Sequence, residues 1–454
     1  MVFKKVISAI LVVILLLTTT GCSLNFFSTE TLLKPPALSG KSGEVQEAFN
    51  KLMSGKTFLL KTPSKGEHKS SFVLFDIDGD NEEEAIVFYT DSSTDTTVRI
   101  AILDCVNDKW ILANDIKGAG SDVYDVAFHD LNGDVLPEII ISWSLFDTKL
   151  TKVLTVYRVV KANNNTFNVE ALANEYFSSK ALLDLNTDGI NDLVLVYLDD
   201  AGEVQNSYFR AFSVSESGAI VKFSEILLDS SITSVSALLS DELVTKSSTY
   251  TRVFIDCLKS DTSIFTEVVI WDVKSSKASR QITEPAKNTL RSSKILSCDI
   301  DKDGNIEVPV NTKFFMNEKD SSVVLSGVVY NFTMVEWKNI AGDNSAETVK
   351  TIYNPIHSYL FLFPWGEDVT VSFNKIENQT NFCIWNTNTK EVEDILFSII
   401  FIEKDKSFSD VIDNYDEKNI IHETESGVFV YEITSYGESY GITDEFVSSS
   451  FIKV

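Results

Sequence analysis

Acidic side chains recur at every second position in a short stretch near the start of the chain. In FDIDGDNEEEAIVFY, residues 75–89, the residues Asp76, Asp78, Asp80 and Glu84 occupy positions one, three, five and nine of a loop that precedes an apolar run. Carboxylates held this closely repel one another unless a cation lies between them. Alternating oxygen ligands suit Ca²⁺, which takes six to eight oxygens at about 2.3–2.6 Å, whereas Mg²⁺ retains water and demands octahedral geometry. The stretch therefore predicts a calcium loop.

The same spacing of oxygen-bearing side chains returns three more times along the chain. A single loop of this kind is readily explained as a solvated acidic turn, but four copies in register are not. The sequence therefore predicts four calcium loops. The ligands predicted in the other three loops are Asp130, Asn132, Asp134 and Glu138; Asp184, Asn186, Asp188 and Asp192; and Asp299, Asp301, Asp303 and Glu307.

The EF-hand is the obvious alternative, because it begins with the same alternation of ligands. It needs a glutamate at position twelve and a helix on either side of the loop. Position twelve is here Val87, Ile141, Leu195 and Val310, each within a β-rich apolar run. The pattern therefore predicts a loop that leads into a strand, with its last side-chain ligand at position nine.

Position six distinguishes the four loops, because the chain must turn there with a positive φ. Gly189 and Gly304 adopt this conformation easily, and Asn81 tolerates it. The second loop has Val135 at this position, which fits poorly. We expect the site at residues 130–138 to be the weakest of the four or to bend differently.

The spacing of the loops predicts a repeat architecture. The first residues of the loops are separated by 54, 54 and 115 residues, so one repeat without a loop is expected before the fourth loop. It is visible as ITSVSALLS, YTRVFIDCL and FTEVVIWDV. About four short β runs per repeat match one propeller blade, whereas linear solenoids usually have shorter repeats. The prediction is a mainly β fold: a β-propeller of about five four-stranded blades, closed when SSFVLFD joins a terminal blade.

The four loops resemble the FG-GAP or VCBS repeats of integrin-type β-propellers, over about residues 68–340. The resemblance implies that calcium is held by the sixteen side chains named above, with backbone carbonyls near position seven as further ligands. Members of this family serve as adhesins, ligand-binding domains and accessory parts of enzymes. The resemblance therefore implies a fold and a metal more specifically than an activity.

The N-terminal segment has the features of an export signal. Two lysines precede an apolar run from Val6 to Leu17, which is shorter than the roughly 20 residues of a membrane-spanning helix, and small residues follow up to Cys22. The segment resembles a bacterial lipoprotein signal, which implies lipidation of Cys22 and an anchor on the extracytoplasmic face of the cell membrane. We expect a signal peptide over 1–22, a tether over 23–41, and a propeller over 42–344 that includes an N-terminal helix near residues 43–54.

The loop pattern stops after residue 344, and residues 345–454 predict a smaller α+β domain. The runs YNPIHSYLFLFPWGEDVTV and SSSFIKV weakly resemble the PsbP-like fold, an antiparallel sheet flanked by helices. This resemblance implies a docking or binding module without assigned chemistry.

Charge, cysteines and histidines narrow the functional classes. A formal net charge of −27 argues against nucleic acid as a partner, because the negatively charged protein and the negatively charged phosphate backbone would repel each other. The widely spaced Cys105, Cys257, Cys298 and Cys383 suggest no zinc site; two disulfides and buried thiols both remain open. No catalytic motif is present, and the four histidines lie in separate segments.

Taken together, these features predict a calcium-stabilised, membrane-tethered extracytoplasmic lipoprotein for binding or adhesion, whose ligand is a protein or a glycan. Two alternatives remain open. One is a carbohydrate-active hydrolase or lyase that uses the propeller as a scaffold. The other is a role in envelope assembly, in which the C-terminal domain docks onto another protein.

Overall fold

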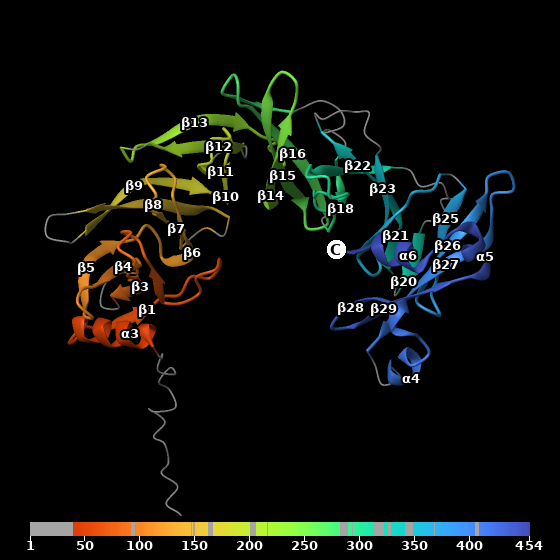
Figure 1. The fold of residues 1–454 in the computed structure, drawn as a ribbon, viewed down its shortest axis with the longest axis horizontal. Helices are drawn as coiled ribbons and strands as arrows, with labels where there is room; N and C mark the ends of the chain where they lie inside the picture. The colour runs from red at the N-terminus through yellow and green to blue at the C-terminus, as the bar shows by residue number, and fades with distance from the viewer. Residues whose placement is uncertain are drawn as a thin grey trace, which may run out of the picture.

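The protein is a curved row of antiparallel β-sheets with a few short helices (Figure 1). Six sheets of four or five strands follow one another in chain order within the part of the chain that the structure describes. The expected mainly β fold is therefore confirmed. The computed structural model describes residues 40–91, 96–146, 148, 150–161, 167–199, 206–215, 217–281, 289–292, 294–312, 322–325, 328–340, 348–366, 368–404 and 408–454.

The first sheet is built around its long strand β3. Strand β4 pairs with one edge of β3, and β1 and β2 lie one after the other along the opposite edge. Strand β2 carries the run SSFVLFD, so this run belongs to the first sheet and does not join the last one to close a ring; that prediction is wrong. The strands are β1 (Phe58–Leu60), β2 (Phe72–Phe75), β3 (Glu84–Asp91), β4 (Arg99–Cys105) and β5 (Trp110–Lys117).

The second and third sheets are simple meanders of four strands, in which each strand pairs with the next in sequence. Each of these sheets has the four strands expected for one repeat. The second sheet contains β6 (Asp122–His129), β7 (Glu138–Ser144), β8 (Lys152–Lys161) and β9 (Phe167–Phe177). The third contains β10 (Ser179–Leu183), β11 (Asp192–Asp199), β12 (Asn206–Val214) and β13 (Ile220–Leu227).

The fourth sheet is the repeat that was expected to lack a metal loop, and its first two strands are joined by a short turn at residues 245–248. Strands β17 and β18 both pair with β16, at its two ends. The strands are β14 (Ser234–Val244), β15 (Thr249–Ser260), β16 (Ser263–Asp272), β17 (Lys277–Arg280) and β18 (Arg291–Ser292).

The fifth and sixth sheets are linked through the C-terminus, because the last strand of the chain pairs with β24 of the fifth sheet. The domain boundary expected after residue 344 falls between β22 and β23, which are paired neighbours in that sheet. The fifth sheet contains β19 (Glu307–Thr312), β22 (Thr333–Asn339), β23 (Val349–Asn354), β24 (Tyr359–Leu362) and β30 (Phe451–Lys453), with a separate hairpin of β20 (Ser322–Leu325) and β21 (Val328–Asn331). The sixth contains β25 (Val369–Asn374), β26 (Gln379–Asn386), β27 (Glu391–Glu403), β28 (Ile420–Glu423) and β29 (Gly427–Ile433).

Neighbouring sheets in the row pack face to face and share apolar cores. This explains why runs such as AIVFY in β3 are continuously apolar: Ile86 and Phe88 face the second sheet, while Ala85, Val87 and Tyr89 face the opposite side. Each fully buried large apolar side chain contributes roughly 1.5–3 kcal/mol. Representative residues of the five shared cores are Phe88 and Trp143, Ile140 and Leu195, Val194 and Val253, Phe254 and Val308, and Phe361 and Phe397.

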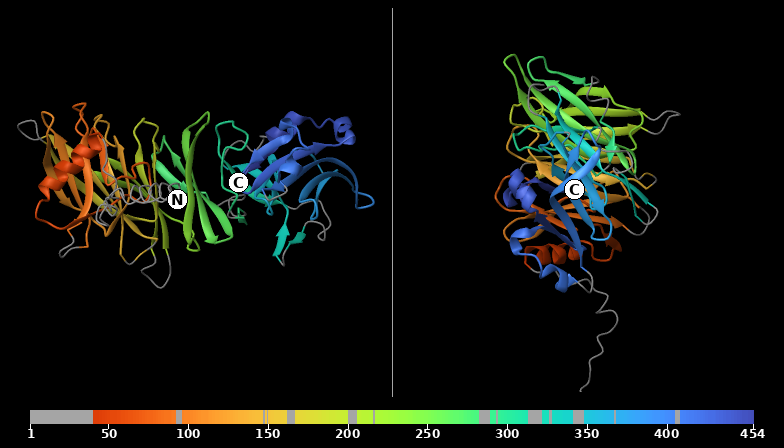
Figure 2. Two further views of the ribbon diagram at one scale, coloured as in Figure 1. Left: turned by 90° about the horizontal axis from the view of Figure 1, so that it is seen from below. Right: turned by 90° about the vertical axis from the view of Figure 1, so that its right-hand side faces the viewer.

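The row does not close into a ring, and the expected closed propeller is not observed. The first and sixth sheets lie at opposite ends of the molecule in two perpendicular views (Figures 1 and 2), and no strand pairing joins them among the described residues. Helices cover both ends instead. Helix α3 (Lys41–Leu52) packs Val45 and Phe49 on the outer face of the first sheet, and α4 (Phe408–Ile412) lies against the outer face of the sixth.

Three short helical segments lie next to the sixth sheet: the 3₁₀ turn η2 (Glu417–Asn419), α5 (Ser435–Tyr440) and α6 (Asp444–Ser450). Helix α5 is capped by Thr434, whose side chain accepts a hydrogen bond from the Gly437 N–H. The four cysteines within the described ranges are free thiols, with Cys257 and Cys383 buried. No helix in these ranges is long and apolar enough to cross a bilayer.

Candidate metal centres

All four predicted loops connect two antiparallel strands or bridged segments, in the first, second, third and fifth sheets. The first loop (residues 76–84) joins β2 to β3, the second (130–138) joins β6 to β7, and the third (184–192) joins β10 to β11. The fourth (299–307) leads into β19 and is closed by a bridge between Cys298 and Glu307. In each loop, position nine is the first residue of the following strand. The loops therefore lead into strands as expected.

The four loops share one backbone conformation. Positions four and six have positive φ in every loop, including position six of the second loop, where Val135 has φ 76°. The second loop therefore bends like the others, and the expectation of a different bend is wrong; whether it binds most weakly stays a prediction. A β-branched residue in the left-handed region is strained. The other positions are Gly79 and Asn81, Gly133, Thr187 and Gly189, and Lys302 and Gly304.

The carboxylate at position one fixes the turn of each loop. In the first loop, the N–H groups of Gly79 and Asn81 donate to the two oxygens of Asp76, at 2.8 and 3.0 Å. Asp130, Asp184 and Asp299 accept from position six in the same way, at 2.8, 2.8 and 2.9 Å. These hydrogen bonds satisfy backbone N–H groups that the tight turn leaves without carbonyl partners.

The carboxylate at position nine lies beneath its loop and is buried in all four cases. One of its oxygens accepts a hydrogen bond from the N–H of position two, at 2.8 Å from Ile77 to Glu84 and at 2.9 to 3.3 Å in the other loops. Burial disfavours the charged form of such a group. It raises the pKa of Glu84 to about 8 and the pKa values of Glu138, Asp192 and Glu307 to about 7.

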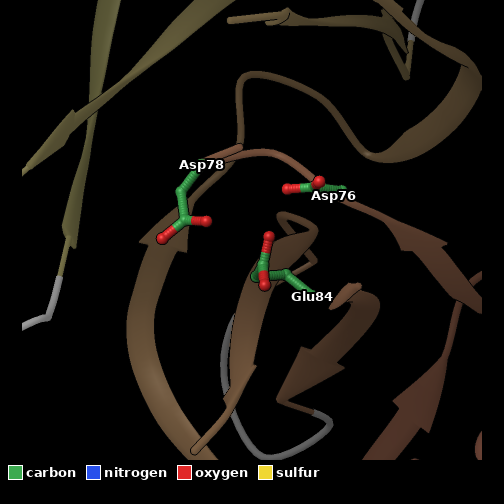
Figure 3. A group of neighbouring side chains, drawn as sticks. All are labelled: Asp76, Asp78 and Glu84. Atoms are coloured by element: carbon green, nitrogen blue, oxygen red, sulfur yellow. The ribbon is translucent and has the colours of Figure 1, made fainter. Parts of the chain in front are cut away.

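The first loop has the most complete set of oxygen ligands. Carboxylate oxygens of Asp76, Asp78 and Glu84 all lie within 4.8 Å of one another and face a common space (Figure 3). Glu84 is fully buried, yet its Oε1 has no hydrogen-bond partner in the part of the chain that the structure describes. Burial, followed by the charge of Asp80, raises the pKa of Asp78. A buried carboxylate that has an unpartnered oxygen and lies beside two further carboxylates is an environment that a bound cation would satisfy.

The fourth loop also brings carboxylates together, although with a different set. Oxygens of Asp299, Asp301 and Asp303 lie within 4.8 Å of one another, and this group does not include Glu307. Glu307 instead accepts from the Ile300 N–H at 3.3 Å. Three aspartates at the loop surface can supply oxygens to a hard cation.

The second and third loops carry asparagine at position three, and its side-chain amide joins the carboxylates. Asn132 Nδ2 donates to Glu138 Oε1 at 2.8 Å and to Asp134 Oδ2 at 3.1 Å. Asn186 Nδ2 donates to Asp188 Oδ2 at 2.8 Å. An amide N–H repels a cation, so these asparagines must turn their oxygen inward before they can act as ligands. Among the described residues, the structure thus groups three predicted ligands in the first loop, without Asp80, and three in the fourth, without Glu307. In the second and third loops only the asparagine and its hydrogen-bond partners are joined, and the complete ligand sets stay a prediction.

One carboxylate near the first loop was not found from the repeat. The register that pairs Ala85 with Leu103 places Asp104 of β4 opposite Glu84, and Asp104 is buried. Burial and the charges of Asp78 and Asp80 raise its pKa. The spacing of residues in the loop does not indicate that the Asp104 carboxylate lies beside the loop, because its position depends on how β3 and β4 pair.

A buried ion pair of the fourth sheet, the sheet without a metal loop, contacts the fourth loop. Arg252 of β15 is fully buried, and its Nε donates to Asp241 of β14 at 2.7 Å. Asp241 accepts from the N–H of Ile306 at 2.6 Å, and Arg252 Nη2 donates to Asn305 Oδ1 at 3.3 Å. The fourth sheet therefore positions the fourth loop through a buried pair that repeat analysis did not identify.

The predicted lipidation site, Cys22, lies outside the described residues. Comparison of the sequence with models of protein families gave no match, and comparison with curated proteins gave none either.

Proposed function

We propose that this protein is a calcium-stabilised, membrane-tethered extracytoplasmic lipoprotein that binds a protein or glycan ligand. The observation that carries the metal part of this proposal is the fully buried carboxylate of Glu84. One of its oxygens lies within 4.8 Å of oxygens of Asp76 and Asp78, and its Oε1 has no hydrogen-bond partner among the described residues. A buried carboxylate oxygen without a donor costs free energy, and a divalent cation would recover it. In this proposal the sheets are propeller-type blades of the FG-GAP or VCBS kind, and the row is open.

Calcium has a structural role in this proposal. The cation would neutralise the loop carboxylates and hold the start of one strand against the end of the preceding one, so that metal binding contributes directly to folding. Extracellular modules commonly bind calcium with dissociation constants of roughly 10⁻⁴–10⁻³ M. Stable folding would then be confined to compartments with millimolar calcium, which agrees with export and with a lipid anchor on Cys22.

Calorimetry on the full chain in detergent tests the metal. The melting temperature is measured in chelator, in 10 mM calcium chloride and in 10 mM magnesium chloride. We expect a higher melting temperature in calcium, because a ligand at 100 times its dissociation constant stabilises the fold by about 2.7 kcal/mol per site. Identical melting curves in chelator and calcium would reject the metal, and an equal rise in magnesium would reject selectivity for calcium.

The anchor is tested separately by expressing the chain and its Cys22→Ser variant in a bacterial host that exports lipoproteins. We expect the unchanged chain to incorporate labelled fatty acid and to partition into the detergent phase, and the variant to do neither. Equal partitioning of the two chains would remove the lipid anchor from the proposal.

A further inference from the structure

A cavity of about 410 Å³ lies at the end of the second and third sheets opposite the metal loops. The first residues of β6, β8, β10 and β14 and the last residues of β9 and β11 contribute to its wall. Its volume is within the range of sites for small molecules. The metal loops follow the other ends of β6 and β10, so the cavity and the loops are separated by the length of these strands.

The wall of this cavity is positively charged in a strongly negative protein. It contains Lys65, Lys152 and Lys180 but a single carboxylate, Asp125. Lys180 Nζ already pairs with Asp125 Oδ1 at 2.6 Å, and Ser142 Oγ donates to the same oxygen at 2.9 Å. Among the described residues, Lys65 and Lys152 form no ion pair. The cavity is therefore lined by two lysines that form no ion pair with a described carboxylate.

Lys152 is the better placed of these two cations. Its Nζ lies 4.5 Å from the centre of the Tyr124 ring and 5.7 Å from that of Phe177, and it donates one hydrogen bond, to the Ser178 carbonyl at 3.3 Å. An ammonium group has three donors, so further donors stay available. Burial lowers the pKa of Lys152, and the charge of Asp125 offsets this only in part. A bound anion would supply the missing charge and accept the remaining hydrogen bonds.

The rest of the wall indicates what kind of anion fits. Ser179 and Ser234 add hydroxyl-bearing residues to the lining, whereas the partly exposed Tyr124, Leu150 and Val235 contribute apolar surface. A ligand with one acid group, several hydroxyls and an apolar ring face matches this combination. A bare inorganic anion would leave the apolar surface uncovered, and a neutral sugar would leave Lys152 without a counter-charge.

We propose that this cavity binds an acidic sugar residue, with its carboxylate at Lys152 and Lys65. This inference rests on the binding role proposed above and specifies the glycan class of ligand. The negative charge of the whole chain opposes the approach of an anion only weakly at physiological salt, because it is screened beyond about 8 Å. Recognition therefore depends on the local excess of lysine in the cavity.

Binding of D-glucuronate to the full chain in detergent and calcium, measured by calorimetry or ligand-observed NMR, tests this site. D-Glucose serves as the uncharged match and inorganic phosphate as the anion without a sugar ring. We expect glucuronate to bind more tightly than either. Equal binding of glucose would reject the acidic group, and equal binding of phosphate would reject the sugar.

Three variants locate the site. Lys152→Met keeps the apolar stem and removes the charge, and we expect it to weaken glucuronate binding about tenfold, the effect of one lost charge-assisted hydrogen bond. Asp125→Asn releases Lys180 from its ion pair and should strengthen binding. Lys274→Met removes an exposed lysine of the β16–β17 turn and should change nothing. Unchanged binding in the first two variants would overturn the proposal even if one of them folds poorly.

The calcium-dependent melting shift is recorded on the same samples, which separates the two proposals. Loss of glucuronate binding with an intact calcium shift in Lys152→Met supports the cavity and leaves the metal proposal standing. Glucuronate binding without any calcium-dependent shift in melting temperature would reject the proposed calcium sites and support the proposed sugar site. If glucuronate does not bind while calcium still raises the melting temperature, only the proposed sugar site is rejected.

Discussion

Leu136 of the second loop packs directly on Gly79 of the first loop, where a Cβ atom would lie 2.7 Å from Leu136 Cδ2. Ile190 of the third loop lies on Gly133 of the second loop in the same way, at 2.8 Å from its would-be Cβ. Position seven of one loop therefore rests on position four of the loop before it. Successive loops are stacked, and their conformations depend on one another.

This stacking explains a difference among the loops that the ligand pattern leaves open. The third and fourth loops precede the fourth and sixth sheets, whose first strands are joined by short turns without a metal loop. Position four is Thr187 in the third loop and Lys302 in the fourth. Side chains are accepted there because no successor loop lies on that position, although φ remains positive. Glycine at position four thus marks a loop that carries a neighbour.

The first prediction concerns this contact. Gly79→Ala and Gly189→Ala both place an alanine at a positive φ, of 76° and 87°, and each should lose roughly 1–2 kcal/mol for that reason. Only Gly79→Ala also meets Leu136, because nothing lies within 4 Å of a Cβ at Gly189. Urea denaturation should show the larger loss for Gly79→Ala, and Leu136→Ala should remove the difference. Equal losses in the two single variants would contradict the stacking.

The second prediction concerns strain at position six of the second loop. Val135 has φ 76°, and its side chain is 86% exposed, so it gains little from packing. Val135→Gly should raise the free energy of unfolding by about 1 kcal/mol, since backbone strain of this kind costs about 1–3 kcal/mol and glycine loses part of the gain in the unfolded chain. Val135→Ala should give a smaller rise. A glycine variant less stable than the unchanged protein would show that the Val135 side chain makes contacts that stabilise the fold by more than the backbone strain costs.

Much of this architecture was predictable because it follows from local patterns. The loop spacing correctly indicated strands after each loop. Carboxylates gather at two of the predicted loops, Asp76 with Asp78 and Glu84, and Asp299 with Asp301 and Asp303; the full set of sixteen ligands stays a prediction. The repeat without a loop was also found, from its β runs. Each of these depends on residues within one repeat.

The features that were missed depend on contacts between repeats. Ring closure was expected from repeat number, but Val45 and Phe49 on helix α3 cover the face of the first sheet that a last blade would need. The boundary at 344 was expected because the loops stop, yet the fifth sheet continues through β23 and is completed by Phe451–Lys453. Strand pairing over about a hundred residues leaves no mark in local hydrophobic spacing.

The third prediction tests the first loop as a cation site. Glu84→Gln keeps the shape of the side chain and removes its charge, so calcium should stabilise the variant less than the unchanged protein. The difference should approach the contribution of one site, about 2.7 kcal/mol at 100 times the dissociation constant. Calorimetry with and without chelator measures it. Asp108→Asn, in the turn between β4 and β5, is the control and should respond to calcium normally; a full calcium response in Glu84→Gln would exclude Glu84 as a ligand.

The fourth prediction concerns the cysteines, whose pairing the sequence left open. Cys257 is fully buried, and burial raises its pKa well above the usual value, so its reactive thiolate is disfavoured. In the folded protein, alkylation should leave Cys257 unmodified and should reach Cys105 sooner, since Cys105 is partly exposed. After unfolding in denaturant without reductant, mass spectrometry should find all four thiols alkylated. A mass that reports a disulfide would contradict the free thiols.

The fifth prediction concerns His357, which is packed against Phe401 with ring centres 4.6 Å apart and has Nε2 2.8 Å from Asn378 Oδ1. Burial lowers its pKa, and the charge of Lys453 acts in the same direction, while the Asn378 contact opposes them. Below about pH 6.5 the unfolded chain therefore binds a proton that the folded chain does not. The free energy of unfolding should fall as pH drops below this value, and less steeply in His357→Gln. Parallel pH profiles for the two proteins would contradict this assignment.

The two helices over the outer sheets have a consequence for the solution behaviour of the chain. Stacked sheets with bare apolar ends can add further copies head to tail, and such contacts generate open filaments because they do not close. Here α3 and α4 occupy both ends with side chains from the same polypeptide. Part of the apolar surface that such a contact would need is therefore already covered within a single molecule.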